Sequence, residues 1–230
     1  MAKQQKLHIA IDGPVAAGKG SVAILLAKRL GIAYVDTGAM YRTVALLGIR
    51  YNVDLQSEAR ILNLLHKHRI TIHSSKEKQS DCFLFLDGED VTDKIRAPEV
   101  SQGSSLVSVH AGVRRYLVGK QQAFARDNDV VMEGRDIAKR VLPDAQVKIF
   151  LTADTEERVN RRYKQLVGRG TPQSFDSVRA ELIERDTRDR TRRIDPLTVE
   201  PDMVVVNSTR LSIEDVVETI INLIPPRFLP

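Results

Sequence analysis

Residues 12–21 carry the most specific chemical signal in the chain. They read Asp-Gly-Pro-Val-Ala-Ala-Gly-Lys-Gly-Ser and follow the apolar run at residues 7–11. The spacing Gly13-x4-Gly18-Lys19 is that of a phosphate-binding loop, in which backbone N–H groups at a helix N-terminus hold phosphate oxygens and the lysine adds a full charge. A chance glycine-rich turn is the alternative. The flanking strand and helix patterns favour the loop and therefore predict a nucleoside triphosphate as ligand.

The residues after Lys19 bear on the metal. The hydroxyl that holds Mg²⁺ usually follows the lysine directly. Here Gly20 stands in that place and the hydroxyl comes one position later, at Ser21. Ser21 is therefore the one candidate metal ligand, and no directly ligated metal is assigned. The Gly-Lys-Gly-Ser ending resembles that of nucleoside monophosphate kinases rather than that of GTPases.

A second signal is the charge of residues 158–193. This segment holds 11 Arg or Lys and 5 Asp or Glu, while the whole chain has a formal net charge of +5. Such an excess suits a site for several phosphates, a nucleic-acid surface or a solvated helix with i,i+4 ion pairs. Interleaved carboxylates and the scarcity of aromatic side chains count against nucleic acid. The phosphate site and the solvated helix both remain open.

Within that segment, Arg185, Asp189 and Arg192 are spaced i, i+4, i+7 and would share one helix face. Clustered guanidiniums repel one another unless an anion lies between them, and the planar fork of arginine suits phosphate. Asp189 would accept from ribose hydroxyls or pair with Arg185. Spacing alone favours neither role.

Two more polar groups, residues 36–42 and 133–136, each follow an apolar run. Ligands of open parallel sheets bind outside the carboxyl ends of the strands, so both groups are predicted to face the same site. Arg135 could reach a phosphate, and Asp136 could accept from an exocyclic base amine. A structural salt bridge between these two neighbours is the alternative.

The elements that must position these groups follow from hydrophobic patterning. Short apolar runs predict core strands at residues 7–11, 33–35, 130–132, 147–151 and 203–206. Helical patterns lie at residues 18–30, 38–52, 110–127, 154–166, 176–193 and 212–224, and Ser212 with Asp215 predicts a capping box at the start of the last. This alternation predicts an α/β fold with a five-stranded parallel sheet flanked by helices.

Residues 62–103 break the alternation. Residues 69–73 and 83–86 are expected to form antiparallel strands around a polar turn at residues 74–81, with a further turn at 87–90, in a small inserted subdomain. The chain of 230 residues is otherwise expected to be a single domain. One cysteine excludes an intrachain disulfide, and Cys82 is expected to be a buried apolar residue. The histidines show no metal-ligand spacing, and no apolar run is long enough to span a membrane or to form a signal core, which favours the cytoplasm.

Taken together, the motifs resemble those of the bacterial cytidylate kinases along nearly the whole chain. The matching stretches are Ile11 through Ser21, Asp36-Thr37-Gly38-Ala39-Met40-Tyr41-Arg42, Asp87-Gly88-Glu89-Asp90-Val91-Thr92 with Ile95-Arg96, Val113-Arg114, Gly134-Arg135-Asp136-Ile137, Leu142-Pro143-Asp144-Ala145, and Glu184-Arg185-Asp186-Thr187-Arg188-Asp189-Arg190. The chain departs from the family pattern at Val15, at Ala16, at Ser21 in place of threonine, and at Ala138-Lys139-Arg140 in place of Gly-Thr-Val.

The resemblance implies a P-loop kinase that transfers a phosphoryl group from ATP, with Mg²⁺, to CMP or dCMP. Residues 62–103 would be a monophosphate-binding insert, and residues 158–175 a lid. The implied ATP-binding residues are Gly13, Pro14, Val15, Ala16, Ala17, Gly18, Lys19, Gly20 and Ser21, and the implied catalytic residues are Lys19, Arg158, Arg161 and Arg162. The implied CMP-binding residues are Thr37, Arg42, Ser105, Arg114, Arg135, Asp136, Arg185, Asp189 and Arg192. Ser105, Arg114 and Asp136 would read the base.

A monomer without nucleic-acid or membrane partners is also expected. Two rival functions remain at this stage: a small kinase with a different acceptor, and a nucleotide-dependent regulator that binds nucleic acid.

Overall fold

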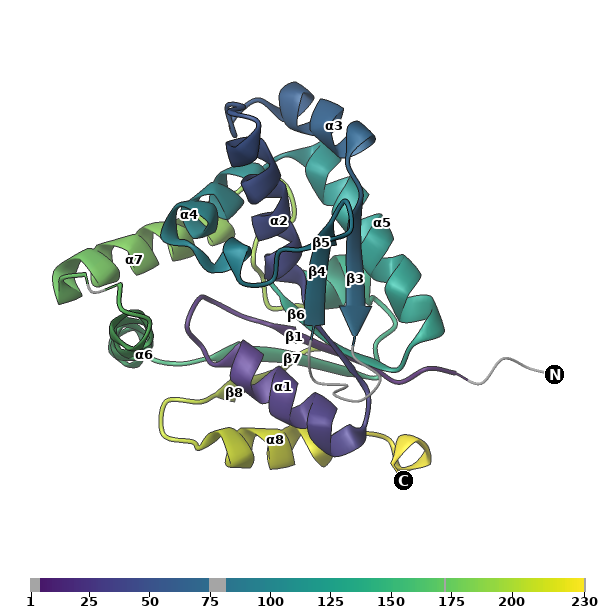
Figure 1. Ribbon diagram of the computed structural model, residues 1–230. Coiled ribbons are helices and arrows are strands. Elements are labelled where there is room, and N and C mark those ends of the chain that lie inside the picture. Colours follow the sequence, from purple (N-terminus) through teal and green to yellow (C-terminus); the bar gives the residue numbers. More distant parts are fainter. Residues whose placement is uncertain (1–4, 75–81, 172, 230) are drawn as a thin grey trace.

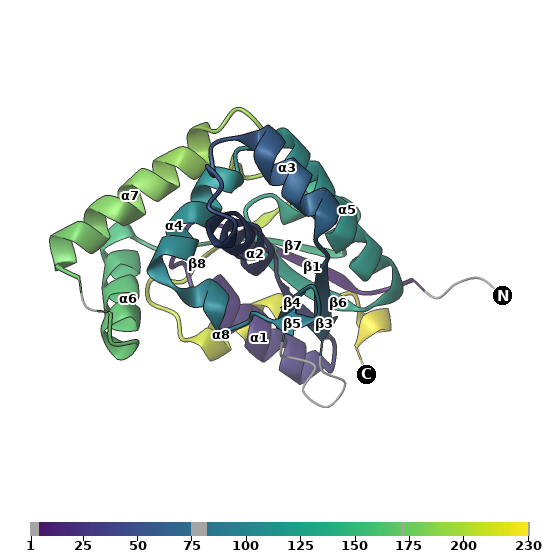
Figure 2. The same ribbon diagram turned by 45° about the horizontal axis from the view of Figure 1, so that its top comes forward.

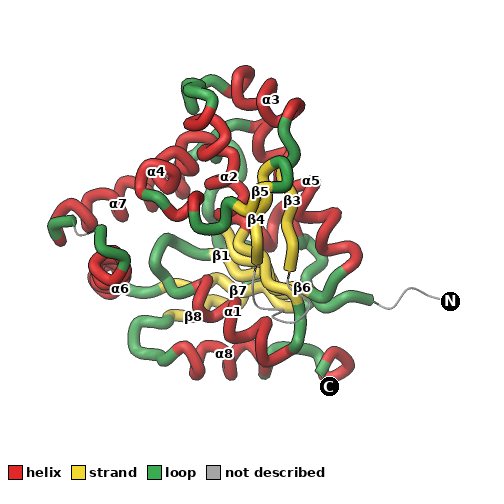
Figure 3. The backbone as a smooth tube through the Cα atoms, in the orientation of Figure 1, coloured by secondary structure: helices red, strands yellow, loops and turns green. Residues whose placement is uncertain are grey.

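The five predicted core strands form one parallel sheet (Figures 1 and 3). The computed structural model describes residues 5–74, 82–171 and 173–229. In spatial order the strands are β2 (Ala33–Asp36), β6 (Val130–Gly134), β1 (His8–Asp12), β7 (Val147–Thr152) and β8 (Val204–Asn207). The expected α/β class and its five-stranded sheet are thus confirmed.

The register of the sheet decides where the polar segments meet. Asp12 of β1 lies opposite Gly134 of β6, and Asp36 of β2 lies opposite Glu133. The carboxyl ends of these three strands therefore reach the same edge. Since β1 is central, the loop that follows it lies at the middle of that edge, between the segments after its neighbours.

Helices cover both faces of the sheet, as the apolar character of its strands requires. They are α1 (Lys19–Leu30), α2 (Thr37–Arg50), α3 (Glu58–Lys67), α4 (Pro98–Val107), α5 (Ala111–Asp127), α6 (Thr155–Gly168), α7 (Phe175–Thr191) and α8 (Ile213–Ile221). Figure 1 shows α1 and α8 side by side beneath the sheet, with α2 and α5 on the other side. Ile9 and Ile11 pack in the core on the first side, and Ala10 packs in the core on the second.

The loop between β1 and α1 contains three residues with positive φ, Gly13, Ala16 and Gly18. Gly13 has φ +151°, and a Cβ there would lie 2.0 Å from the carbonyl oxygen of Leu151. No side chain fits this position, so the backbone contact between β1 and β7 fixes the residue as glycine. Ala16 has φ +58°, a left-handed conformation that alanine adopts at a cost of about 1–2 kcal/mol.

The inserted segment contains more helix than the sequence indicates. The strands β3 (Ile70–Ser74) and β4 (Cys82–Leu86) pair antiparallel as predicted, and β5 (Glu89–Asp90) extends them where only a turn was expected. The helices α3 and α4 and the 3-10 turn η1 (Lys94–Arg96) were not predicted. The polar turn assigned to residues 74–81 lies, apart from Ser74, outside the described residues. A hydrophobic cluster centred on Ile61, Leu84 and Leu117 joins the segment to α2 and α5.

The helices α6 and α7, both predicted, project away from the sheet (Figure 2). They share a small cluster of their own, formed by Val159, Leu166, Val178 and Leu182. After β6 the chain forms a π-helical turn, η2 (Ile137–Val141), which the sequence did not indicate. The capping box at α8 is confirmed, and the 3-10 turn η3 (Pro226–Phe228) ends the fold. Among the described helices, none is both long and apolar enough to cross a membrane.

Candidate active site

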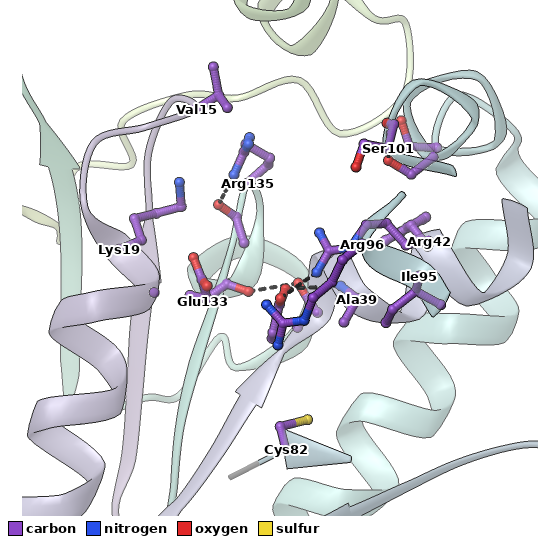
Figure 4. Close-up of a pocket in the computed structure, with 18 of the residues that line it drawn as sticks. Val15, Lys19, Ala39, Arg42, Cys82, Ile95, Arg96, Ser101, Glu133 and Arg135 are labelled. Atoms are coloured by element: carbon purple, nitrogen blue, oxygen red, sulfur yellow. Dashed lines mark hydrogen bonds and ion pairs between the residues drawn. The ribbon is translucent and has the colours of Figure 1, made fainter. Parts of the chain in front are cut away.

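A pocket of about 640 Å³ opens at the carboxyl edge of the sheet. Figure 4 shows Lys19 on one side of it, Arg42 and Arg96 on the other, and Glu133 and Arg135 between them. The pocket walls include most of the residues singled out in the sequence: Val15, Ala16, Gly18, Lys19, Gly20, Ser21, Thr37, Arg42, Ser105, Arg114, Arg135, Asp136, Arg162, Arg185, Asp189 and Arg192. Five of the candidates lie outside these walls: Gly13, Pro14, Ala17, Arg158 and Arg161.

Lys19 is buried at the start of α1, only 5% exposed. Its Nζ donates to the carbonyl of Pro14 at 2.8 Å, so the side chain folds back along its own loop. Burial, with the neighbouring guanidinium of Arg135, lowers the pKa of Lys19 to about 7. Burial makes the charged form of Lys19 less stable than in water, and any anion that enters the pocket stabilises this charged form.

Two carboxylates end neighbouring strands beside this lysine. Glu133 accepts from the Tyr34 hydroxyl at 3.0 Å, and burial together with Asp36 raises the pKa of Glu133. Burial alone would raise the pKa of Asp36 as well, but the guanidinium of Arg42, 2.6 Å away, brings it below its usual value. Thr37 donates its hydroxyl to the backbone of Glu133 at 2.7 Å and so ties β2 to β6.

Arg135 and Asp136, although adjacent, do not pair with each other. Arg135 donates to Asp189 at 2.8 Å, so the alternative of a salt bridge between the two neighbours is not the arrangement in the structure. Of the two roles left open for Asp189, the pairing with Arg185 is not formed, and its carboxylate accepts from Arg135. Arg185 keeps a buried Nε that has no hydrogen-bond partner among the described residues. Burial, with the charge of Arg135, lowers the pKa of Arg185 to about 10.

Asp136 lies in the pocket wall within a network of arginines. Arg114 donates to one of its oxygens and Arg192 to the other, the latter at 3.5 Å. Both arginine side chains are almost fully buried. Burial raises the pKa of Asp136, and Arg114 and Arg192 oppose that rise. Arg192 sits one residue past the end of α7, so the shared helix face predicted for it is only approximate.

Ser105 lies on α4, where its hydroxyl accepts from Arg188 at 2.6 Å. Arg188 itself does not line the pocket, so the contact orients Ser105 from behind. This pairing joins α4, which begins in the inserted segment and extends beyond it, to α7. The helical spacing of residues 185–192 places Arg188 near the other basic residues, but it does not indicate that Arg188 contacts Ser105.

Arg158 and Arg161 support the loop from outside the pocket. Arg158 is 4% exposed, pairs with Asp186 and donates to the carbonyl of Val15 at 3.2 Å. Arg161 donates to the carbonyl of Ala17 and lines a second cavity of about 650 Å³ on the other side of the loop. Arg162 lies in the walls of both cavities.

Several pocket residues were not among the sequence candidates. Arg96 and Arg169 contribute two exposed cations that form no ion pair with any residue the structure describes, and Tyr41 lies under Arg114 at 5.8 Å. Cys82 was expected to be buried but is half-buried in the pocket wall, and burial raises the pKa of its thiol to about 12. Arg96 and Tyr41 both lie in stretches that match the family pattern, so the sequence held a signal for each of them, whereas Cys82 carries no such signal.

The charge of the pocket indicates its ligand. Among the described residues its walls carry nine cationic side chains and four carboxylates. Such an excess in a partly buried site is stabilised by a ligand with several negative charges. Three of the four carboxylates are bound to arginines, and the fourth, Glu133, accepts from the hydroxyl of Tyr34. The arrangement therefore suits a reaction between anions that needs positioning and charge neutralisation.

Comparisons with known proteins agree with this chemistry. The sequence model of the cytidylate kinase family matches residues 9–226. A cytidylate kinase of Geobacillus sp. (strain WCH70) is 42% identical over 224 residues, which are 97% of this chain and 99% of that protein. One from Caldanaerobacter subterraneus is 45% identical over 214 residues, 93% of this chain and 92% of that protein.

Among solved structures, that of an uncharacterized protein from Eubacterium ventriosum ATCC 27560 aligns with a TM-score of 0.53 over 96% of this chain and 98% of that one. At 13% identity this likeness concerns the fold alone.

Proposed function

Since the chain belongs to the cytidylate kinase family, we propose that its cationic pocket is where ATP and a cytidine monophosphate meet. The protein is a phosphotransferase that converts ATP and CMP or dCMP into ADP and CDP or dCDP. The observation that supports the pocket as the site is its excess of cations over carboxylates beside a phosphate-binding loop. The two rival functions, a small kinase with a different acceptor and a nucleotide-dependent regulator that binds nucleic acid, are not favoured.

The residues divide the pocket into a donor half and an acceptor half. The donor half is the loop at residues 13–21 with Lys19, and the second cavity beyond it would take the nucleoside part of ATP. The acceptor half would place the CMP phosphate among Arg42, Arg135 and Arg192. The sugar would lie at Arg185 and Asp189. The unpartnered Nε of Arg185 supports this placement, because a buried donor is stabilised by a ligand oxygen.

The base would be read by Asp136, Arg114 and Ser105. Asp136 can accept from the exocyclic amine of cytosine, and its two arginines keep the carboxylate in place. A uracil presents an oxygen at that position, which a carboxylate repels.

Mg²⁺ fits the donor half only as a partner of ATP. Among the described residues no three His, Cys, Asp or Glu side chains are grouped to hold a metal. Mg²⁺ commonly takes one or two protein ligands and fills its other positions with phosphate oxygens and water. Ser21 and Glu133 line the pocket beside Lys19 and would hold the ion, directly or through water. When bound, it would offset charge on the phosphates.

The transfer itself requires no general base from the chain. The acceptor is a phosphate oxygen with a second pKa of about 6, so it is largely ionised near neutral pH. Lys19 and the arginines hold the donor and acceptor phosphates in line and stabilise the charge that spreads over the transferring group. The insert (residues 62–103) and the lid (residues 158–175) would close over both nucleotides and exclude water, which would otherwise hydrolyse ATP.

One coupled assay of ADP release tests the function. The purified protein is given ATP with each of CMP, dCMP, UMP, AMP and shikimate. Fast turnover with CMP and dCMP, and slow turnover with the others, is expected. Turnover that favours a different acceptor would contradict the assignment, and slow turnover without any acceptor would point to a regulator. The expectations of a monomer, of no nucleic-acid partner and of a cytoplasmic location stay predictions; size-exclusion chromatography and salt-dependent RNA binding test the first two.

A further inference from the structure

One residue outside the pocket walls touches two of the arginines proposed to hold CMP. Asp195 follows α7, where the chain turns back towards β8, and has φ +47°. Its Oδ2 accepts from the Nε of Arg114 at 3.1 Å, and its backbone carbonyl accepts from the Nε of Arg192 at 2.6 Å. The same residue thus holds one arginine through its side chain and the other through its backbone.

Arg114 is fixed on every edge by these contacts. Besides Asp195, it donates to the carbonyl of Ser108 at 3.2 Å and to Asp136. Its side chain is 3% exposed. A guanidinium with three edges bonded to three separate acceptors has one available orientation, and that orientation sets the position of the Asp136 carboxylate.

The second oxygen of Asp195 leads to a residue at the surface. It accepts from the Nε of Arg140, whose side chain is 53% exposed, whereas that of Asp195 is 8% exposed. Burial would raise the pKa of Asp195, but its hydrogen bonds with Arg140 and Arg114 keep it below the usual value. Arg140, Asp195, Arg114 and Asp136 therefore form a chain of alternating charges that runs from solvent to the base end of the pocket.

The residues that anchor this chain belong to the π-helical turn η2. Lys139 pairs with Glu200 at 2.9 Å, next to the contact between Arg140 and Asp195. Lys139 and Arg140 stand where the family pattern has Thr and Val. The two pairs fasten residues 195–200 onto η2, and Leu197, 5% exposed, packs beneath them.

We propose that Asp195 is a positioning residue that fixes the orientation of Arg114 and Arg192. Through these two arginines, Asp195 would set the selectivity of the enzyme for the base of the acceptor nucleotide. The proposal rests on the proposed function, since it concerns the same pocket. A purely structural alternative exists: Asp195 and Glu200 would fasten the same loop, and neither would affect substrate selection in particular.

The variant Asp195→Asn distinguishes the positioning role from the purely structural one. Asparagine tolerates left-handed φ and has the same shape, so the backbone contact with Arg192 is kept. Its one amide oxygen can accept from Arg114 or from Arg140 but not from both, and its NH₂ meets the other guanidinium. We expect KM for CMP to rise about tenfold while KM for ATP changes less than about twofold, because the negative charge between the two guanidiniums is lost together with one of its two hydrogen bonds. The preference for CMP over UMP in kcat/KM should fall with it.

Two further variants complete the experiment. Glu200→Gln breaks the neighbouring ion pair without touching Arg114 and is expected to leave both KM values unchanged. Arg140→Met removes the outer cation, so that Asp195 keeps its hydrogen bond to Arg114 but is no longer anchored by Arg140. We expect KM for CMP to rise about threefold. Should Asp195→Asn fail to fold in a thermal-unfolding check, the comparison of Arg140→Met with Glu200→Gln decides the question.

The proposal is overturned if Asp195→Asn has wild-type KM values or if it raises KM for CMP and KM for ATP equally. It is also overturned if Glu200→Gln raises KM for CMP as much as Asp195→Asn does. These results differ from a failure of the proposed function, which would appear as a lack of CMP turnover in the wild-type protein in the same assay.

Discussion

The donor and acceptor halves of the pocket are built in different ways. The donor half is one run of residues, 13–21, whose backbone forms the site and whose only charged side chain is Lys19. The acceptor half is made of side chains from α2, α4, α5 and α7 and from the segments that follow β6 and α7, held by ion pairs such as Arg135–Asp189 and Arg114–Asp136. A backbone site is determined by local conformation, whereas a side-chain site is determined by which elements the fold brings together.

This difference predicts different sensitivities. A substitution in the donor half should lower kcat, because both substrates take part in the phosphoryl transfer. A substitution in the acceptor half should raise KM for CMP and leave KM for ATP unchanged.

Lys19→Met should have the largest effect. It removes the only full charge of the loop, and a lost contact of this kind costs roughly 10²–10³-fold in kcat. Steady-state kinetics with ATP and CMP measure it. Lys28→Met makes the same change on an exposed position of α1 and should leave kcat unchanged. Near-normal turnover in Lys19→Met would remove the lysine from the donor half.

Asp136→Asn should raise KM for CMP by roughly 10- to 100-fold, because a buried charged acceptor loses its interaction with the base and with two arginines. KM for ATP should stay close to that of the wild type. Asp144→Asn, on the exposed turn after η2, is the matched control. An equal rise for both substrates would mean that Asp136 supports the whole pocket and does not read the base.

The lowered pKa of Lys19 predicts that ATP binding is coupled to proton uptake. With a pKa of about 7, most of the lysine is neutral at pH 8 in the free protein. Bound phosphates stabilise its charged form, so binding at pH 8 should take up nearly one proton and affinity should fall about tenfold per pH unit above 7. Calorimetry in two buffers with different ionisation enthalpies measures the uptake. Lys19→Met should show none at this pH, and an unchanged uptake in that variant would assign the proton to another group.

Ala16→Gly should have the smallest effect, and it should be on stability. Relief of the left-handed strain at Ala16 exceeds the added backbone entropy of glycine by a margin of about 0.5 kcal/mol. Urea unfolding should therefore show a slight stabilisation with both KM values preserved. Ala180→Gly, on an exposed position of α7, should instead destabilise by about 1 kcal/mol. A loss of stability in Ala16→Gly would show that the methyl group contributes packing in the loop.

The same division explains what the sequence analysis found and missed. The strands, most helices and the loop were predicted because their signals lie within windows of a few residues. The helices α3 and α4 were missed: α4 has few apolar positions, and α3 lies beside a strand pattern that dominated the segment. Arg158 was assigned to the transferring phosphates through its family position, yet its partners are Asp186 and the backbone of Val15. Nothing in the spacing of Arg158 and Asp186 shows that they meet.

Local sequence patterns were enough to predict the class of the fold, the phosphate-binding loop, the family and most of the polar groups that face the edge of the sheet. Glycine spacing, apolar periodicity and charge are local properties, and they can be read without coordinates. The tertiary structure alone decided the partners: Arg135 with Asp189 rather than Asp136, Ser105 with Arg188, and Asp195 between Arg114 and Arg140. Such pairs join residues up to 83 positions apart, and chain spacing carries no information on contacts that only the packing of helices and strands creates.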